Sequence, residues 1–257
     1  MFSPKPCFCV RRPSLSGIFG GGRKGFTLTE LLVVMAIILV LAALGFTGTK
    51  AFLQRARSAR GISNLRQIGA LALSYAADNN FQLPVQIDDW GNYSAPPTTR
   101  FFQNILRMNA DLPTVGKDLY TSPWLPELFY DPTIKKGRQH PWGCFGVNDA
   151  IIVNAWTCNV KYGQRNGIPL SRINSPERKV IVCSAKSPGP SPWFQSSWYF
   201  SGDVWVDQGS TSTTPNGLPD PRHGGRTASL FADGHIELLD TNSMSKADRQ
   251  KYFLLDP

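Results

Sequence analysis

The longest apolar segment of the chain lies near its N-terminus. Residues 31–49 are 19 consecutive positions without a formal charge, and Glu30 directly precedes them. At 1.5 Å per residue, a helix of this length extends about 28 Å, close to the thickness of a hydrocarbon core. The pattern therefore predicts a helix that crosses a membrane once. Because an unpaired charge in hydrocarbon costs roughly a few kcal/mol, we expect Glu30 to lie at the membrane edge or to have a partner.

Two other interpretations of this segment stay open. The first is an ordinary secretory signal, with a small-residue cleavage site near Leu41-Ala42-Ala43. The second is an anchor that is never cleaved. Neither accounts for the acidic residue at the head of the apolar run, nor does the first account for a helical pattern that continues beyond it.

A helical pattern follows the apolar run. Apolar residues recur every three or four positions, which is typical of an amphipathic helix: Phe52, Ala56, Ala59, Ile62, Leu65, Ile68, Leu71 and Tyr75. The cluster Asp78-Asn79-Asn80 is a plausible end, and no proline interrupts the segment. One helix is therefore predicted from about Thr27 to about Ala77, on the order of 75 Å long. A compact head cannot cover that length, so part of the helix is expected to lie in lipid or against other copies.

The character of the chain changes from Phe81 onward. All seven Trp residues lie in this part, which is long enough for one compact domain. We expect a short helix at 101–108, strands at 145–153 and 180–185, and a single helical turn at Ser175-Pro176-Glu177, capped by the serine. Residues 209–217 are rich in Ser, Thr, Pro and Asn and predict a mobile loop.

The clearest local signal is a β-hairpin near the C-terminus. Residues 227–232 and 235–239 flank Asp233-Gly234, a dipeptide that readily adopts the positive φ angles of a two-residue turn. Such a turn pairs residue 232 with 235 and residue 231 with 236. The expected inner face, which would pack on the long helix, carries Ser229, Phe231, Ile236 and Leu238. The expected outer face carries Leu230, Ala232, His235 and Glu237.

Charge narrows the choice of partners. The formal net charge is +9, but residues 1–25 carry five basic residues and no acidic one. Removal of this segment leaves +4, from 22 basic and 18 acidic residues. A nucleic acid is therefore not favoured as a partner. Positive charge before an apolar span also favours a cytoplasmic N-terminus. The asymmetry is blunted by basic residues that closely follow the span: Lys50, Arg55, Arg57 and Arg60.

The string Lys24-Gly25-Phe26-Thr27-Leu28-Thr29-Glu30, followed by the apolar run, resembles the processing site of type IV prepilins and of the pseudopilins of type II secretion systems. The resemblance implies that a prepilin peptidase cleaves after Gly25 and methylates Phe26. It also implies that Glu30 pairs with the N-terminal ammonium of a neighbouring subunit during assembly. The implied fold is α+β, with a long N-terminal helix packed on a small antiparallel-sheet head.

A second resemblance lies at the other end of the chain. His223, nine further residues and then Asp233-Gly234 are similar to a C-terminal signature of a large bacterial group of pilin-like proteins. In this interpretation the signature stabilises the hairpin, with His223 hydrogen-bonded near the Asp233 carboxylate. The segments 64–69 and 75–80 are similar to the part that follows the membrane in that group.

These observations divide the chain into a leader at 1–25, a long helix at 26–79 with a membrane span at about 31–49, and an extracytoplasmic head at 80–257. The expected protein is a single-pass subunit of the bacterial inner membrane that assembles into a type II secretion pseudopilus or a type IV pilus-like filament, at the surface or in the periplasm. Its expected partners are the prepilin peptidase, other pilin or pseudopilin subunits and the inner membrane. The alternative is a membrane-anchored carbohydrate-binding protein, because aromatic residues gather in a Pro/Gly/Ser-rich region: Trp193, Trp198, Tyr199 and Trp205.

Catalysis, cofactors and disulfides have weaker signals. His223 with Asp233 could form an acid–base pair, and Ser229 or Cys183 a nucleophile, but no nucleophile elbow or phosphate loop accompanies them, so we expect no enzyme and no cofactor. Calcium is the one cofactor weighed, because four aspartates could supply oxygens, although without a regular loop spacing: Asp203, Asp207, Asp220 and Asp233. Cys144 and Cys158 could form a disulfide, and buried free thiols at Cys144, Cys158 and Cys183 are an equal alternative.

Overall fold

The computed structural model describes residues 25–85, 102–113, 125–140, 143–152, 166–187, 195–197, 199–209 and 217–256. The chain forms two compact units, Met1–Thr49 and Lys50–Pro257. Residues 1–24 of the expected leader and residues 210–216 of the expected mobile loop lie outside the described residues.

The predicted long helix is confirmed. Helix α1 runs from Leu28 to Asp78 and contributes to both units. It ends where expected, because Asn80 and Phe81 adopt φ angles of 54° and 58° that no helix can continue. Phe81 then donates its backbone N–H to the carbonyl oxygen of Ala76 (2.7 Å). This bond satisfies one of the carbonyl groups that a helix C-terminus leaves without an internal partner.

The prediction of a membrane-spanning helix is not confirmed by the described residues. No helix assembled from the described residues combines the length and the apolar character needed to cross a membrane. The predicted span at 31–49 includes residues 43–48, whose side chains are outside the described part of the chain.

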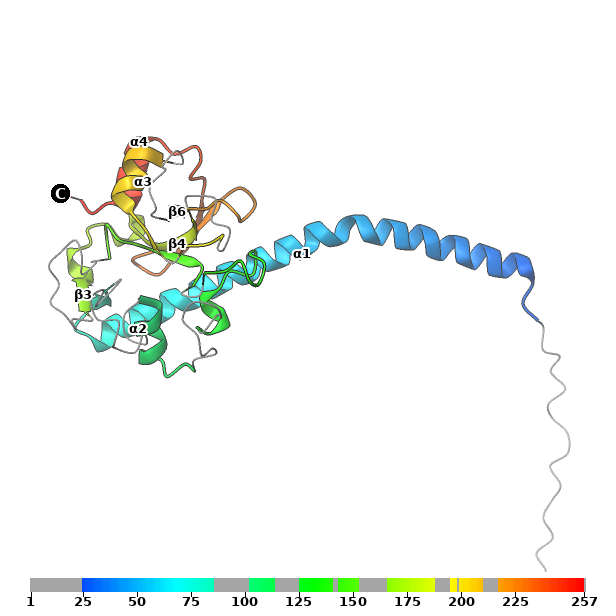
Figure 1. Cartoon of the computed structure of the whole chain (residues 1–257), viewed down its shortest axis with the longest axis horizontal. Helices are drawn as coiled ribbons and strands as arrows, with labels where there is room; N and C mark the ends of the chain where they lie inside the picture. Colours follow the sequence, from blue (N-terminus) through cyan, green and yellow to red (C-terminus); the bar gives the residue numbers. More distant parts are fainter. Residues whose placement is uncertain are drawn as a thin grey trace, which may run out of the picture. The chain divides into compact units, whose positions relative to one another are not determined.

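The head has the α+β fold that the sequence predicts (Figure 1). Within its described part, a two-stranded sheet pairs β1 with β3, and a six-stranded sheet has the order β5-β2-β4-β7-β8, with β6 also on β4. All pairings are antiparallel except that of β2 with β5. The strands are β1 (Gln82–Pro84), β2 (Phe145–Asn148), β3 (Asn166–Pro169), β4 (Val180–Lys186), β5 (Tyr199–Phe200), β6 (Leu218–Pro219), β7 (Thr227–Phe231) and β8 (Ile236–Leu239).

Shorter helices complete the head: α2 (Phe102–Asn109), α3 (Gly202–Gln208) and α4 (Lys246–Phe253), with 3₁₀ turns η2 (Glu127–Phe129), η3 (Leu170–Arg172) and η4 (Pro176–Arg178). Helix α2 and strand β4 confirm the predictions for 101–108 and 180–185. Strand β2 is shorter than the predicted 145–153. It ends at Asn148, whose side chain accepts the N–H of Ala150 and donates to the carbonyl oxygen of Val180.

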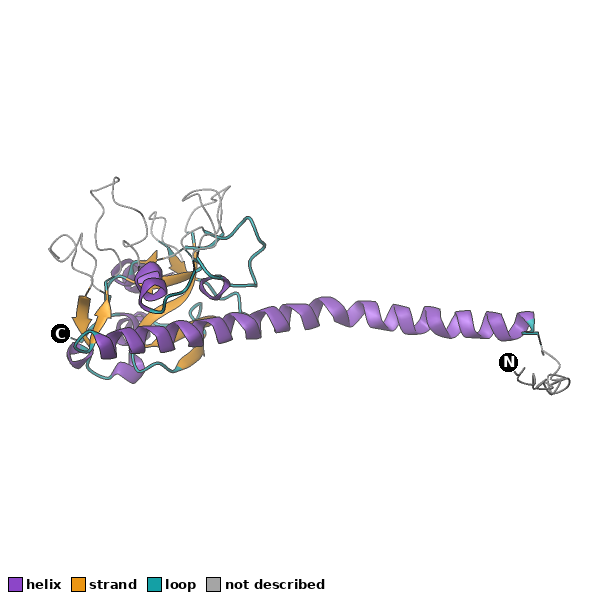
Figure 2. Cartoon of the chain, turned by 90° about the horizontal axis from the view of Figure 1, so that it is seen from below, coloured by secondary structure: helices purple, strands orange, loops and turns teal. Residues whose placement is uncertain are grey.

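The six-stranded sheet separates two hydrophobic cores. One core joins the sheet to the head portion of α1, which lies across the strands in Figure 2, and includes Leu65, Ile68, Ala72, Ala228 and Leu230. The other joins the sheet to α3 and α4 and includes Phe200, Trp205, Phe231, Leu239 and Phe253. Because both faces are covered, every residue of β7 is buried.

The C-terminal hairpin forms, but its predicted register is wrong by one residue. Leu230 pairs with Ile236 and Ser229 pairs with Glu237. The loop therefore has three residues rather than two, and Gly234 takes the positive φ of 92° that closes such a loop. A one-residue slip moves the side chains of the slipped strand to the other face.

The face that packs on α1 keeps the predicted Ile236 and Leu238 of β8, but β7 contributes Ala228 and Leu230 in place of the predicted Ser229 and Phe231. Leu230 lies directly over the helix, since a Cβ added at Gly69 would be 2.6 Å from its Cδ1 atom. Phe231, expected on this face, instead packs with α4, where its ring meets the Tyr252 ring edge-on at 6.1 Å.

The predicted serine cap at Ser175 is also wrong. Turn η4 does begin with Pro176, but Ser175 has a left-handed backbone (φ 53°), and its side chain makes no capping hydrogen bond. A cap requires an extended backbone at the residue before the helix, because only that conformation brings the side-chain oxygen over the free N–H groups.

Candidate functional site

The expected processing site lies immediately before α1. Gly25 and Phe26 are exposed and non-helical, and 84% of Phe26 is accessible to solvent. No described atom comes within 4 Å of the position that a Cβ at Gly25 would occupy. The peptide bond between these two residues is therefore open to an enzyme that approaches from outside the chain.

Glu30 is positioned by the local structure of the helix start. Its Oε2 atom accepts hydrogen bonds from the backbone N–H of Thr27 (2.8 Å) and from the Thr27 hydroxyl (2.9 Å). In return, the backbone N–H of Glu30 donates to the Thr27 Oγ1 atom (3.3 Å). This reciprocal pattern is a capping box, the arrangement typical of Thr-x-x-Glu at a helix N-terminus.

The capping box gives Glu30 a role within its own chain. Two N–H groups of the first turn obtain partners, and a negative charge lies where the helix dipole favours it. Because a carboxylate has two oxygens with about four acceptor sites, the exposed Glu30 can still bind an ammonium group from another chain. Thr27 was not among the predicted site residues, although the Thr-x-x-Glu spacing to Glu30 is sufficient to predict a capping box.

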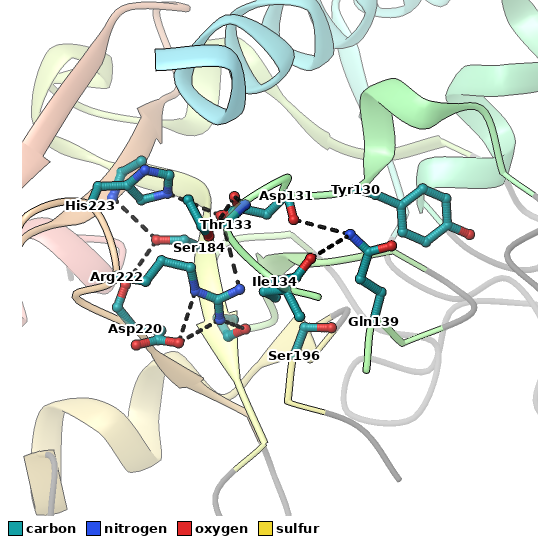
Figure 3. A network of polar contacts seen from close by, with 12 residues as sticks. Tyr130, Asp131, Thr133, Ile134, Gln139, Ser184, Ser196, Asp220, Arg222 and His223 are labelled. Atoms are coloured by element: carbon teal, nitrogen blue, oxygen red, sulfur yellow. Dashed lines mark hydrogen bonds and ion pairs between the residues drawn. The ribbon is translucent and has the colours of Figure 1, made fainter. Parts of the chain in front are cut away.

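A second candidate site lies in the head, beneath α1. The His223 ring is completely buried and forms a hydrogen bond at each nitrogen, and Figure 3 shows its contact with Asp131. Its Nε2 atom donates to Asp131 Oδ2 (3.0 Å), and its Nδ1 atom shares a hydrogen bond with the Ser58 hydroxyl (2.9 Å). These bonds join α1, the loop after η2 and the loop after β6, which are distant in the sequence.

His223 is held by a tight turn. It pairs with Arg226 across Gly224 and Gly225, through bonds of 3.0 and 3.4 Å between the backbone groups of residues 223 and 226. The two glycines have φ angles of 67° and 85°. Positive φ at both central residues is the requirement of a type I′ turn, and glycine meets it without strain.

Asp131 is the acceptor at the centre of this network. Its Oδ1 atom takes hydrogen bonds from the backbone N–H and the hydroxyl of Thr133, at 2.9 and 2.7 Å. Burial acts to raise the pKa of this carboxyl, but the His223 hydrogen bond and the charge of Arg222 outweigh it, so the pKa lies below its ordinary value. Asp131 is therefore held as a buried anion with satisfied oxygens.

Arg222 carries the balancing charge. Its Nε donates to Asp220 Oδ2 (2.8 Å), its Nη2 donates to the carbonyl oxygen of Ala185 (2.6 Å), and its Nη1 lies 3.9 Å from Asp131 Oδ2. Figure 3 shows the guanidinium between the two carboxylates. The cluster thus fixes the loop after β6 to strand β4.

The predicted contact between His223 and Asp233 does not form. Asp233 instead accepts hydrogen bonds from the backbone N–H (3.0 Å) and from the Nδ1 atom (2.6 Å) of His235. Both residues of that pair are about one-third exposed or more, whereas His223 and Asp131 have no exposed side-chain surface. The signature residues therefore belong to two separate His–Asp pairs.

The order Ser58–His223–Asp131 is that of a nucleophile, a base and an orienting carboxylate. Here, however, the histidine ring is completely covered, and Ser58 is part of helix α1 rather than of a strained elbow. The nucleophiles considered from sequence are elsewhere. Ser229 is buried in β7, and burial raises the pKa of the Cys183 thiol well above its usual value.

The four aspartates considered for calcium do not converge. Asp207 pairs with Lys246 (2.7 Å), Asp220 with Arg222, and Asp233 with His235. In the part of the chain that the structure describes, no group of three His, Cys, Asp or Glu residues could hold a metal ion.

The cysteine and aromatic predictions are only partly within the described residues. Cys144 and Cys183 are buried free thiols, while Cys158 lies outside, as do Cys7 and Cys9. Trp205 is a core residue of the α3–α4 layer, with 1% exposure, so it offers no stacking surface. Tyr199 is partly buried in β5, and Trp193 and Trp198 are outside the described residues.

Comparison with known proteins bears on the N-terminal site. Residues 21–46 match the family model described as the prokaryotic N-terminal methylation motif. Comparisons with curated proteins and with solved structures gave no match. The matched segment contains Gly25, Phe26, Thr27 and Glu30, and it is consistent with a prepilin-like protein.

Proposed function

We propose that this protein is a pilin-like structural subunit, made as a precursor and assembled into a type II secretion pseudopilus or a type IV pilus-like filament. A prepilin peptidase cleaves after Gly25 and methylates Phe26. The observation that carries the proposal is the methylation motif over residues 21–46. The exposed, non-helical Gly25–Phe26 bond, directly before α1, supports it.

In this proposal the N-terminal apolar segment holds the subunit in the bacterial inner membrane, with the leader in the cytoplasm and the head outside it. Five basic residues precede the segment and five more follow it between residues 50 and 66, so the proposed orientation rests on the methylation motif rather than on charge. The capping box supports the role of Glu30 because it fixes the carboxylate only one turn from the new N-terminus. A neighbouring subunit, shifted slightly along the axis, can then bring its ammonium to this carboxylate.

The cleavage step is tested by Gly25→Leu in full-length precursor expressed with a prepilin peptidase. We expect the variant to keep its leader, because the enzyme must recognise the residue before the cut. Gly22→Leu is the matched control, since it makes the same change three residues upstream and should be processed. Loss of the leader from Gly25→Leu, seen as a normal mobility shift on a gel, would contradict the proposed cleavage site.

The assembly step needs variants that separate the two roles of Glu30. Glu30→Gln keeps the capping box, because glutamine at this helix position also accepts the N-cap N–H, but it removes the charge. Thr27→Ala removes the cap and keeps the charge. We expect Glu30→Gln to be processed but excluded from filaments, and Thr27→Ala to be incorporated. The opposite result would show that the cap, rather than an ion pair between subunits, is what assembly requires.

We also propose that the head acts through packing rather than through chemistry. The Ser58–His223–Asp131 connection joins α1 to two loops of the sheet, and the covered ring suits a structural joint. These bonds would keep the head fixed on α1, the helix that is proposed to assemble into the filament.

A further inference from the structure

We propose that the head binds the phosphate headgroup of an anionic phospholipid in a cationic groove beside the first turns of its helix. The groove is formed by residues 50–58 of α1 and by the loop 221–225. This inference rests on the proposed function, because it needs the apolar segment to lie in a membrane.

The charge pattern of α1 is the first support. Between residues 50 and 77 the helix contains five basic residues and no acidic one: Lys50, Arg55, Arg57, Arg60 and Arg66. Arg60 is neutralised by Glu127 at 2.9 Å. For Lys50, Arg55 and Arg57, all exposed, no ion pair is found among the described residues. Three cations without an ion-pair partner in the described part of the chain therefore lie within about two turns of helix.

The surface beside these cations is hollowed on both sides of the helix. One hollow of about 410 Å³ is lined by Arg55 and Ser58 together with the loop residues Arg222 and Gly224. The other, of about 620 Å³, is lined by Lys50 and Arg57 and by the same two loop residues. Both hollows are open to solvent, so a headgroup can enter them from the surface.

Arg222 forms part of the wall of the groove on the loop side. Its side chain is 90% buried, yet its Nη1 atom has no hydrogen-bond partner among the described residues. Guanidinium groups satisfy their donors on carboxylate or phosphate oxygens, frequently two at a time. Arg222 lines both hollows, but its Nη1 atom is covered and faces Asp131 Oδ2 at 3.9 Å, so the headgroup would be bound by the exposed cations of α1.

The groove residues lie next to the apolar run in the sequence, and this position favours a lipid headgroup over a free anion. Lys50 directly follows the uncharged run 31–49, and Arg57 is seven residues later. Seven residues of helix extend about 10 Å, comparable with the headgroup region of one leaflet. Basic clusters next to an apolar helix are attracted to anionic lipid surfaces. A nucleic acid would require a longer basic surface than three cations provide.

The test uses the full chain in neutral detergent. Native mass spectrometry measures the binding of added phosphatidylglycerol and of phosphatidylcholine at equal concentrations. We expect phosphatidylglycerol to bind at least about tenfold more tightly, and the preference to disappear in Lys50→Gln/Arg55→Gln/Arg57→Gln. Arg66→Gln is the matched control, because it removes an exposed cation of the same helix outside the groove, and it should keep the preference.

Other results would overturn the inference. Equal binding of the two lipids, or an unchanged preference in the triple variant, would show that the groove is not a binding site for anionic lipid. Equally tight binding of inorganic phosphate would show an anion site with no lipid specificity, and tighter binding of a DNA duplex would identify a nucleic-acid surface. The N-terminal residue of the same sample separates the two proposals. A mature Phe26 N-terminus without lipid preference refutes only the groove, whereas an uncut N-terminus refutes the proposed function.

Discussion

Replacement of Asp131 by Asn tests whether the buried network joins α1 to the sheet. The substitution keeps the shape of the side chain and removes the negative charge that faces His223 at 3.0 Å and Arg222 at 3.9 Å. Hydrogen bonds to charged groups contribute about 1.5–3 kcal/mol, and removal of one partner from a buried pair costs about 3–5 kcal/mol. Because asparagine still accepts from Thr133, we expect a loss of about 2–4 kcal/mol in the free energy of unfolding.

The chain supplies its own control. Asp233 makes a closer contact with a histidine, 2.6 Å to His235, but 34% of its side chain is exposed. Exposed ion pairs contribute about 0–1 kcal/mol, so Asp233→Asn should cost no more than that. Urea unfolding of the full chain in neutral detergent, followed by tryptophan fluorescence, measures both variants. Equal losses of unfolding free energy in the two variants would refute the idea that burial makes the His223–Asp131 pair more stabilising than an exposed pair.

The same pair predicts a pH dependence. The pKa of Asp131 is lower in the folded chain than its ordinary value, so the unfolded chain binds a proton more readily. The stabilisation is therefore complete above the unfolded pKa of about 3.9 and is lost as the pH falls through the folded value. The difference between wild type and Asp131→Asn should shrink below about pH 4. A difference that stays constant down to pH 2 would contradict this assignment.

Three further predictions concern the head. In Gly61→Ala the new Cβ would lie 2.9 Å from the fixed His223 ring, so we expect urea midpoints to fall even though alanine favours a helix by about 1 kcal/mol; an unchanged midpoint would show that the ring can move. A fluorophosphonate probe should leave Ser58 unlabelled, and labelling would indicate a nucleophile. Because burial raises the pKa of Cys144 to about 11 and that of Cys183 well above its usual value, iodoacetamide should modify both only after unfolding, as peptide mass spectrometry can show.

The elements with strong local signals were predictable from the sequence. The apolar periodicity through Tyr75 and the end at Asp78-Asn79-Asn80 defined α1 to within about a residue at each end. Strand β4 was predictable from a different signal, the β-branched residues Val180, Ile181 and Val182. The hairpin was predicted because Asp233-Gly234 favours a turn, but a two-residue and a three-residue loop suit this dipeptide about equally well. The observed register places Leu230 against Gly69 of α1 and Phe231 against Tyr252 of α4, and these tertiary contacts are not visible in the local sequence.

The buried network could not be read from the sequence. His223 was visible as half of a signature, yet its partners are 92 residues away at Asp131 and 165 residues away at Ser58. Neither partner lies in a pattern that distinguishes it from ordinary loop or helix residues. Asp233 was the nearest acidic candidate in the signature, but the hairpin loop directs it to His235. Contacts of this kind depend on how the sheet lies on α1, and no local rule specifies that arrangement.

The central claim concerns the new N-terminus, and one measurement tests it directly. Full-length protein, expressed with a prepilin peptidase and purified from membranes, is digested, and its N-terminal peptide is sequenced by mass spectrometry. The account predicts a chain that begins at Phe26 with one added methyl group on its amino nitrogen. A chain that still begins at Met1, or that begins beyond residue 41 as an ordinary secretory signal would leave it, would contradict the account.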